Sequence, residues 1–178
     1  MKKSVTLVEL IMGIILLGVI LLAATSFDLA SRQFFKSSDF KSELLAEASF
    51  VMDHIDKHLS EITGYASDKG YNRASANTFW LRTASGTYEY RVAGNVLQFC
   101  DITAGGTCEV LTQKLSPIAG DPLLNASGIS FSDNVTIDNN CAVEVKLSLL
   151  YRPGEAEHYK TNPRVTLWSR TALIQHSF

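Results

Sequence analysis

The chain has 178 residues, of which 46% are hydrophobic, so it can bury one ordinary core but has little room for a second independent domain. Its 16 Lys and Arg residues nearly balance its 18 Asp and Glu residues, giving a formal net charge of -2. This balance excludes the broad positive field that would gather nucleic acid or anionic lipid, so we expect no nucleic acid among the partners.

The first predicted element is an apolar helix. The sequence from Leu10 to Phe27 contains no charged residue, and as an α-helix it spans about 27 Å, just enough for the hydrocarbon core of a bilayer. Lys2 and Lys3 stand shortly before this run, and basic flanks favour the cytoplasmic side of a membrane. The pattern therefore predicts one transmembrane helix, with the bulk of the chain outside the cytoplasm.

The helical pattern continues beyond the apolar run, where apolar residues recur at three- and four-residue steps between polar ones. No proline occurs before Pro117, and Gly64 is a natural C-terminal stop. We therefore predict one long helix that ends at Gly64, with a transmembrane half over residues 5–27 and an amphipathic half over residues 28–64. The apolar positions of the second half are Ala30, Phe34, Leu44, Leu45, Ala48, Val51, Met52, Ile55, Leu59 and Ile62.

Short β-favouring runs separated by turn residues follow over residues 65–178. The polar segment over residues 67–77 is predicted to be a loop, and Gly94-Asn95 is the clearest hairpin turn. Consecutive strands joined by short turns indicate an antiparallel sheet, covered by the amphipathic half of the helix. The predicted fold is α+β, with the long helix first. The predicted strands are Thr78 to Thr83, Thr87 to Val92, Val96 to Ile102, Cys108 to Lys114, Gly128 to Ser132, Ala142 to Tyr151 and Arg164 to Ile174.

Three cysteines, Cys100, Cys108 and Cys141, lie in the part of the chain that is expected outside the cytoplasm, where disulfides persist. Cys100 and Cys108 are the favoured pair, because the Gly-Gly turn between them can close a hairpin that brings both thiols within bonding distance. A loop of this length contributes about 2.5 kcal/mol in the chain-entropy model. In the alternative interpretation all three thiols are reduced and buried, which fits Cys141 best because it opens an apolar strand.

Glu9 lies at the cytoplasmic edge of the apolar run. A carboxylate near the interior of a bilayer costs about 2 to 3 kcal/mol or more unless a cation neutralises it. No basic residue stands within four positions downstream, and Lys2 and Lys3 lie upstream in what reads as a removable leader. A new α-amino group that cleavage after Ser4 would create is one candidate partner of Glu9, and in an assembly the amine of a neighbouring subunit is another.

This N-terminus resembles that of the type IV pilins and the type II secretion pseudopilins. Those proteins share a short basic leader, a small residue at the cleavage point, an apolar-Thr-Leu-apolar-Glu string and a long apolar helix. Here the residues read MKKS, VTLVE and LIMGIILLGVILLAA, so the resemblance covers residues 1–24. It implies a pilin-like fold and a leader over residues 1–4, removed by a membrane-embedded aspartic peptidase that cuts between Ser4 and Val5 and methylates the Val5 amine. It also implies that Glu9 engages the N-terminal amine of the adjacent subunit during filament assembly.

Two positions depart from the family pattern, with Ser4 where glycine is nearly always found and Val5 where phenylalanine is usual. A substituted leader is better tolerated in a subunit needed in few copies, which favours a minor pilin or minor pseudopilin. The amphipathic helix, the Tyr-rich hairpin and the long late hairpin are similar to the minor subunits labelled W in pili and J in secretion systems.

The resemblance also implies a location and a set of partners. The chain is expected in the inner membrane as a single-pass protein with its C-terminal part in the periplasm, and later in a pilus or pseudopilus. The implied partners are sibling minor and major pilins or pseudopilins, the prepilin peptidase, the inner-membrane assembly platform and the lipid bilayer.

Two alternatives stay open at the level of sequence. An ordinary signal peptide cleaved near Ala24 would release a soluble periplasmic β-rich protein, but its hydrophobic region would be unusually long and Glu9 would be unexpected. A membrane-anchored binding protein or enzyme would leave Glu9 without a role.

Candidate catalytic and metal-binding groups are few. His54 and His58 share a helical face, but Ile55 stands where a zinc-protease motif needs glutamate, so a solvated polar flank is the expected environment. The sequence contains no nucleophile elbow, phosphate loop or Cys-x-x-Cys motif. We expect no enzymatic activity, no metal and no cofactor.

Overall fold

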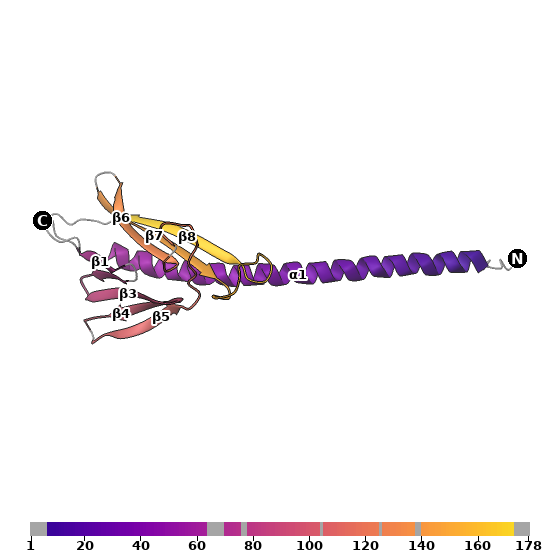
Figure 1. Cartoon of the computed structure of the whole chain (residues 1–178), viewed down its shortest axis with the longest axis horizontal. Helices are drawn as coiled ribbons and strands as arrows, with labels where there is room; N and C mark the ends of the chain where they lie inside the picture. The colour runs from indigo at the N-terminus through magenta and orange to yellow at the C-terminus, as the bar shows by residue number, and fades with distance from the viewer. Residues whose placement is uncertain are drawn as a thin grey trace.

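The structure is a computed structural model and describes residues 7–63, 70–75, 78–103, 105–124, 126–137 and 140–172. Within these residues, one long helix is followed by eight strands, which form a five-stranded and a three-stranded antiparallel sheet. The N-terminal half of the helix extends away from the rest of the chain, while the C-terminal half lies along both sheets (Figure 1). The predicted α+β fold, with a long N-terminal helix packed on antiparallel β-structure, is confirmed.

Helix α1 runs from Leu7 to Ser60. It contains no proline, and Gly13 and Gly18 are its only glycines, so nothing in its sequence forces a break. The helix ends before the predicted stop at Gly64, which itself lies outside the described residues. Ile62 already forms an isolated antiparallel bridge with Thr83, so contact with the sheet replaces the last turn that the sequence predicts.

In the five-stranded sheet each strand pairs with the next along the chain, in the order β1-β2-β3-β4-β5. Gly94 and Asn95 form the turn between β3 and β4, with Gly94 at a φ of 63° and Ala93 paired with Val96. Two-residue hairpin turns need positive φ, which glycine adopts without a Cβ penalty, and the hairpin predicted here is confirmed. The strands are β1 (Tyr71–Ser75), β2 (Thr78–Arg82), β3 (Thr87–Ala93), β4 (Val96–Asp101) and β5 (Thr107–Thr112).

Strand β1 shows that the prediction of a loop over residues 67–77 was wrong for Tyr71–Ser75. Tyr71 pairs with Leu81 of β2, so the hairpin adds a polar segment as an edge strand. Tyr71 is buried, and its ring centroid lies 5.9 Å from that of Phe79. Strand pairing and one buried aromatic ring therefore outweigh the low β-propensity of the neighbouring residues. Neither the pairing nor the burial of Tyr71 is revealed by the local sequence pattern.

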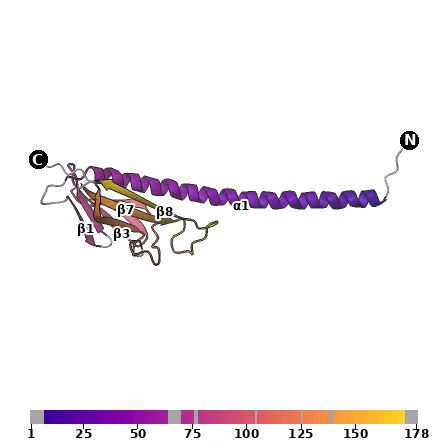
Figure 2. The same cartoon turned by 90° about the horizontal axis from the view of Figure 1, so that it is seen from above.

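The three-stranded sheet has the order β6-β7-β8, with β6 at Ile129–Ile137, β7 at Asn140–Leu150 and β8 at Arg164–Ala172. Strand β8 lies along α1. The connection between β7 and β8, over residues 151–163, extends beside α1 toward its N-terminal half in both views (Figures 1 and 2). We call this connection the β7–β8 loop.

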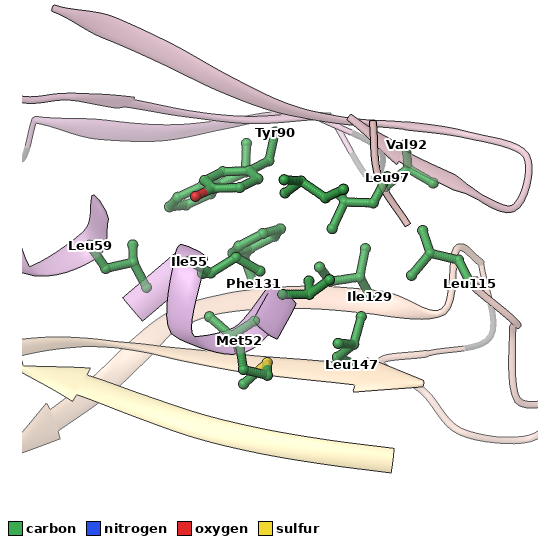
Figure 3. Close-up of a cluster of buried hydrophobic side chains, with 14 of the residues drawn as sticks. Met52, Ile55, Leu59, Tyr90, Val92, Leu97, Leu115, Ile129, Phe131 and Leu147 are labelled. Carbon is green, nitrogen blue, oxygen red and sulfur yellow. The ribbon is translucent and has the colours of Figure 1, made fainter. Parts of the chain in front are cut away.

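One hydrophobic core joins the two sheets and the C-terminal half of α1. Phe79 of β2 stacks on Phe131 of β6, so the sheets also contact each other directly. Figure 3 shows side chains from α1 and from both sheets directed into this common cluster. The buried residues of the helix face are Leu44, Ala48, Val51, Met52, Ile55 and Leu59.

Candidate functional site

The N-terminal half of α1 presents an apolar surface on all sides of the helix. Every residue from Leu7 to Ala30 is exposed, and the helix projects alone beyond the sheets (Figure 2). By length and composition this helix can cross a membrane. An apolar surface of this extent is stable only against lipid or against other apolar helices. Its large exposed side chains between Leu10 and Phe27, a stretch that we call the apolar segment, are Leu10, Ile11, Met12, Ile14, Ile15, Leu16, Leu17, Val19, Ile20, Leu21, Leu22 and Phe27.

The two hydroxyl groups of the apolar segment are satisfied inside the helix. Thr25 Oγ1 donates a hydrogen bond to the carbonyl oxygen of Leu22 at 3.0 Å, and Ser26 Oγ donates to the same oxygen at 2.8 Å. Hydrocarbon offers no partner to a polar group, so hydroxyls within a membrane are expected to bond to the backbone of their own helix. Both side chains are therefore compatible with a lipid environment.

Charged residues mark both ends of the apolar segment. Asp28 and Arg32 form an i,i+4 ion pair just beyond Phe27, with 2.9 Å between Asp28 Oδ2 and Arg32 Nε. Glu9 and Asp28 are about 28 Å apart along a straight helix, which is close to the thickness of a hydrocarbon core. The spacing of the first charges on either side thus matches a single membrane crossing.

Glu9 lies in the first turn of α1, where the positive end of the helix dipole favours a carboxylate. Its side chain is exposed at the N-terminal edge of the apolar segment. A carboxylate at this position is accessible to a cation from outside the helix, such as the amine of a neighbouring chain. Ser4 and Val5 lie outside the described residues, so cleavage between them and methylation of Val5 stay predictions.

Cys100 and Cys108 form a disulfide in the structure, with an S–S distance of 2.06 Å, and they are the pair that the sequence favours. The two residues lie opposite each other on β4 and β5, with their Cα atoms 4.0 Å apart. The bond therefore joins the two strands of the outermost hairpin of the five-stranded sheet. Cys141 belongs to β7, and its side chain is not among the described parts of the structure.

His54 and His58 are not on a solvated flank, so that prediction was wrong. His54 Nδ1 lies 3.1 Å from Tyr90 Oη, and the His58 ring stacks on Phe99 with centroids 4.6 Å apart. Burial lowers the pKa of both imidazoles. The Glu109 carboxylate partly opposes this effect for His54, whereas the neighbouring His54 lowers the pKa of His58 further. These contacts make both rings part of the helix–sheet contact. Among the described residues, no group of three or more candidate metal ligands is found.

Charged residues of α1 also hold the helix against the sheets. Lys114, which follows β5, lies 3.0 Å from Glu43 Oε1 and 2.8 Å from Glu47 Oε2 of the helix. About two and a half helical turns beyond Glu47, Asp56 accepts hydrogen bonds from Ser169 and Thr171 of β8, each at 2.7 Å. These contacts add to the buried apolar face of α1 in attaching the helix to both sheets. Sequence reasoning missed these contacts, because residues so far apart in the chain leave no local signal of their pairing.

Comparisons of the chain with protein-family models, with curated proteins and with solved structures find no match. What the chain does is therefore inferred from its own residues and geometry. The structural features that bear on function are the exposed apolar segment, Glu9 at its edge, and the attachment of α1 to both sheets.

Proposed function

We propose that this chain is a minor pilin or minor pseudopilin, a structural subunit that helps to initiate or cap a type IV pilus or a type II secretion pseudopilus. The observation that carries the proposal is the organisation of α1. Its exposed apolar segment begins directly after Glu9, and its C-terminal half is built into a β-rich domain. This combination suits a subunit that is stored in a bilayer and later assembled through the same helix.

In this role the apolar segment first holds the subunit in the inner membrane. On assembly it packs against the helices of neighbouring subunits, exchanging lipid contacts for protein contacts at little hydrophobic cost. Cleavage between Ser4 and Val5 supplies the new amine, and Glu9 pairs with the amine of the adjacent subunit. That ion pair sets the axial register between one helix and the next, because the surrounding apolar surfaces are not directional.

The β-rich domain is the part that faces outward in the periplasm and contacts sibling subunits. Extraction from the membrane requires that a pull on this domain moves the helix with it. The ion pairs of Lys114 with Glu43 and Glu47 and the hydrogen bonds of Asp56 supply that connection. The energy for extraction comes from assembly machinery outside this chain, so the role of the protein is mechanical and structural.

Substitution of Glu9 by alanine in the full chain tests the proposal. We expect Glu9→Ala to be processed and inserted into the membrane as usual, since it removes only a charge at the edge of the span. It should be absent from sheared and purified filaments, because the contact with the neighbouring amine is lost. Asp53→Ala is the matched control, since it removes an exposed carboxylate of α1 that forms no ion pair with any described residue, and it should be incorporated normally. Normal incorporation of Glu9→Ala would remove the assembly role proposed for Glu9.

A further inference from the structure

A groove of about 270 Å³ lies between the middle of α1 and the β7–β8 loop. Ser37 Oγ donates a hydrogen bond to the carbonyl oxygen of Tyr159 at 3.2 Å, which holds the loop against the helix at this level. We call this feature the loop groove. It is lined by Gln33, Lys36 and Phe40 of α1 and by His158, Lys160 and Thr161 of the loop.

The loop groove contains two positively charged side chains, Lys36 of α1 and Lys160 of the β7–β8 loop. Glu155 and Glu157, the acidic residues of the β7–β8 loop, each form an ion pair with an arginine. Lys36 and Lys160 form no ion pair with any described residue, and Lys160 Nζ instead lies 5.4 Å from the centre of the Tyr159 ring. Two ammonium groups are thus available to an anion that enters the groove, although the chain as a whole carries no net positive charge.

The loop groove lies close to the expected surface of the membrane. If Glu9 marks one edge of the hydrocarbon, a core of about 30 Å ends near Leu29, twenty helical residues further on. The headgroup layer adds about 5 to 7 Å, which reaches approximately to Gln33. Gln33 is the groove residue of α1 nearest to the membrane. Lys36 lies one helical turn farther from the membrane, but its long side chain can reach back toward the headgroups.

The apolar surface of the segment continues into the groove. Leu22, Leu29 and Lys36 follow one another at seven-residue steps and therefore share one face of α1, with Phe40 one turn beyond Lys36. Leu22 is 69% exposed and Leu29 is 62% exposed, so a lipid chain can lie along both side chains. A lipid molecule in that position places its headgroup between the helix and the β7–β8 loop.

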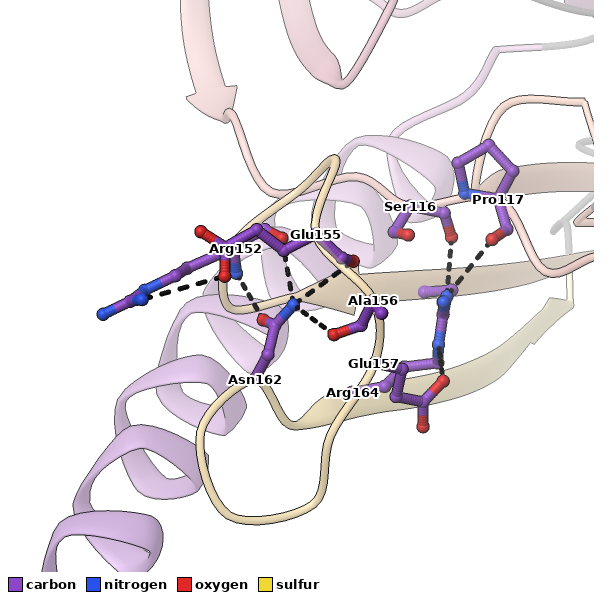
Figure 4. Close-up of polar contacts among 9 residues, drawn as sticks. Ser116, Pro117, Arg152, Glu155, Ala156, Glu157, Asn162 and Arg164 are labelled. Carbon is purple, nitrogen blue, oxygen red and sulfur yellow. Dashed lines mark hydrogen bonds and ion pairs between the residues drawn. The ribbon is translucent and has the colours of Figure 1, made fainter.

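The β7–β8 loop is held in a defined conformation by buried polar groups (Figure 4). The amide side chain of Asn162, which is only 2% exposed, accepts a hydrogen bond from Arg152 N at 2.7 Å and donates to Ala156 O at 3.2 Å. Arg164, at the start of β8, donates from Nε to Glu157 Oε2 of the loop at 2.7 Å. The loop side of the groove is therefore already shaped before a ligand arrives, which lowers the entropy cost of binding.

We propose that the loop groove binds the phosphate group of an anionic phospholipid of the membrane that holds α1, between the ammonium groups of Lys36 and Lys160. This inference rests on the proposed function, because it requires the apolar segment to lie in a bilayer. The bound lipid gives the subunit a second membrane contact. It fixes the orientation of the β-rich domain over the membrane, and the contact must break when the subunit is extracted into a filament.

Fluorescence quenching in vesicles tests this contact with the full chain. The reporter is Tyr159→Trp, in a chain whose own Trp80 and Trp168 are replaced by phenylalanine, and the quencher is phosphatidylcholine with a nitroxide on its headgroup. The control chain keeps only Trp168, which is 66% exposed on β8, whereas Tyr159 is 72% exposed on the loop. Vesicles of phosphatidylcholine, with and without phosphatidylglycerol, provide neutral and anionic surfaces. We expect strong quenching of Tyr159→Trp, greater on anionic vesicles, and weak quenching of Trp168.

Neutral substitutions of the two groove lysines test whether these residues cause the preference for anionic vesicles. Lys36→Gln and Lys160→Gln should each reduce the preference for anionic over neutral vesicles, measured by the quenching of Tyr159→Trp, about fivefold. This is the factor expected for the loss of one lysine near an anionic surface. Lys41→Gln and Lys57→Gln, which remove exposed lysines of α1 outside the groove, are the matched controls and should leave that preference unchanged.

The outcomes separate this inference from the proposed function. If the chain floats with vesicles after an alkaline wash but Tyr159→Trp is quenched no more than Trp168, the lipid contact is wrong and the membrane anchor stands. The lipid contact is also wrong if quenching does not respond to Lys36→Gln and Lys160→Gln. If the chain does not float with the vesicles at all, membrane anchoring by the apolar segment is wrong, and the groove contact fails with it.

Discussion

Phe79 in β2 and Phe131 in β6 stack face to face across the boundary between the two sheets, with ring centroids 4.3 Å apart and ring planes 4° from parallel. Phe79 is 2% exposed and Phe131 is 8% exposed, so both rings belong to the core. The two strands come from different sheets and from distant parts of the chain. This stack therefore helps to join the sheets into one domain beneath α1.

Phe79→Ala should destabilise the domain by about 3 to 5 kcal/mol, because it removes a buried ring from both the Phe131 stack and the contact with Tyr71. The free energy of unfolding can be measured by denaturant titration of the full chain in detergent, followed by near-UV circular dichroism. Phe35→Ala removes an exposed ring from α1 and should change stability by less than about 0.5 kcal/mol. Equal losses in the two variants would show that the stack has no special part in joining the sheets.

Reduction of the Cys100–Cys108 disulfide should lower the melting temperature by roughly 5 to 10 °C, which corresponds to about 2.5 kcal/mol for a loop of this length. The double variant Cys100→Ser, Cys108→Ser should melt at the reduced value and should not respond to added reductant. Alkylation before reduction should modify one cysteine of the three. Modification of all three cysteines in the untreated protein would contradict the disulfide.

The stability of the domain should fall on acidification below pH 6.5. Burial lowers the folded-state pKa of His54 and His58 from 6.5, an effect that the nearby carboxylates of Glu109 and Glu61 only partly oppose. As the pH falls through 6.5, the unfolded chain takes up protons that the folded chain does not, so the free energy of unfolding decreases until the folded-state pKa values are passed. Above pH 6.5 both states are neutral at these positions, and this contribution to stability is fully present.

The double variant His54→Gln, His58→Gln checks this pH dependence. Its melting temperature should vary less between neutral pH and mildly acidic pH than that of the unmodified chain, because two of the groups that titrate are absent. An unchanged pH profile in this variant would mean that other residues cause the acid sensitivity.

Local pattern in the sequence was sufficient to predict the elements that depend on neighbouring residues. The helix follows from an uninterrupted helical pattern without proline, and the β3–β4 turn follows from Gly94-Asn95, since only a few residues adopt positive φ without strain. Glu9 stood out because a carboxylate beside an apolar run is costly.

The parts that escaped prediction depend on contacts between distant residues. The local pattern predicts Tyr71 in a polar loop, but Tyr71 is a strand residue because it pairs with β2 and its ring packs against Phe79. The helical pattern predicts solvated side chains for His54 and His58, but aromatic residues of β3 and β4 cover them. The division of the strands into two sheets likewise follows from packing around α1, which no local pattern encodes.

The position at which the mature chain begins decides whether Glu9 has an amine to pair with. We predict that the chain isolated from membranes lacks residues 1–4, begins at Val5 and carries one added methyl group on the Val5 amine. An intact mass combined with N-terminal peptide sequencing will show this. In that case Glu9 has the nearby amine that its assembly role requires. A chain that begins near Ala24, as an ordinary signal peptide would leave it, or one that retains Met1 in assembled filaments, would contradict the assembly role of Glu9.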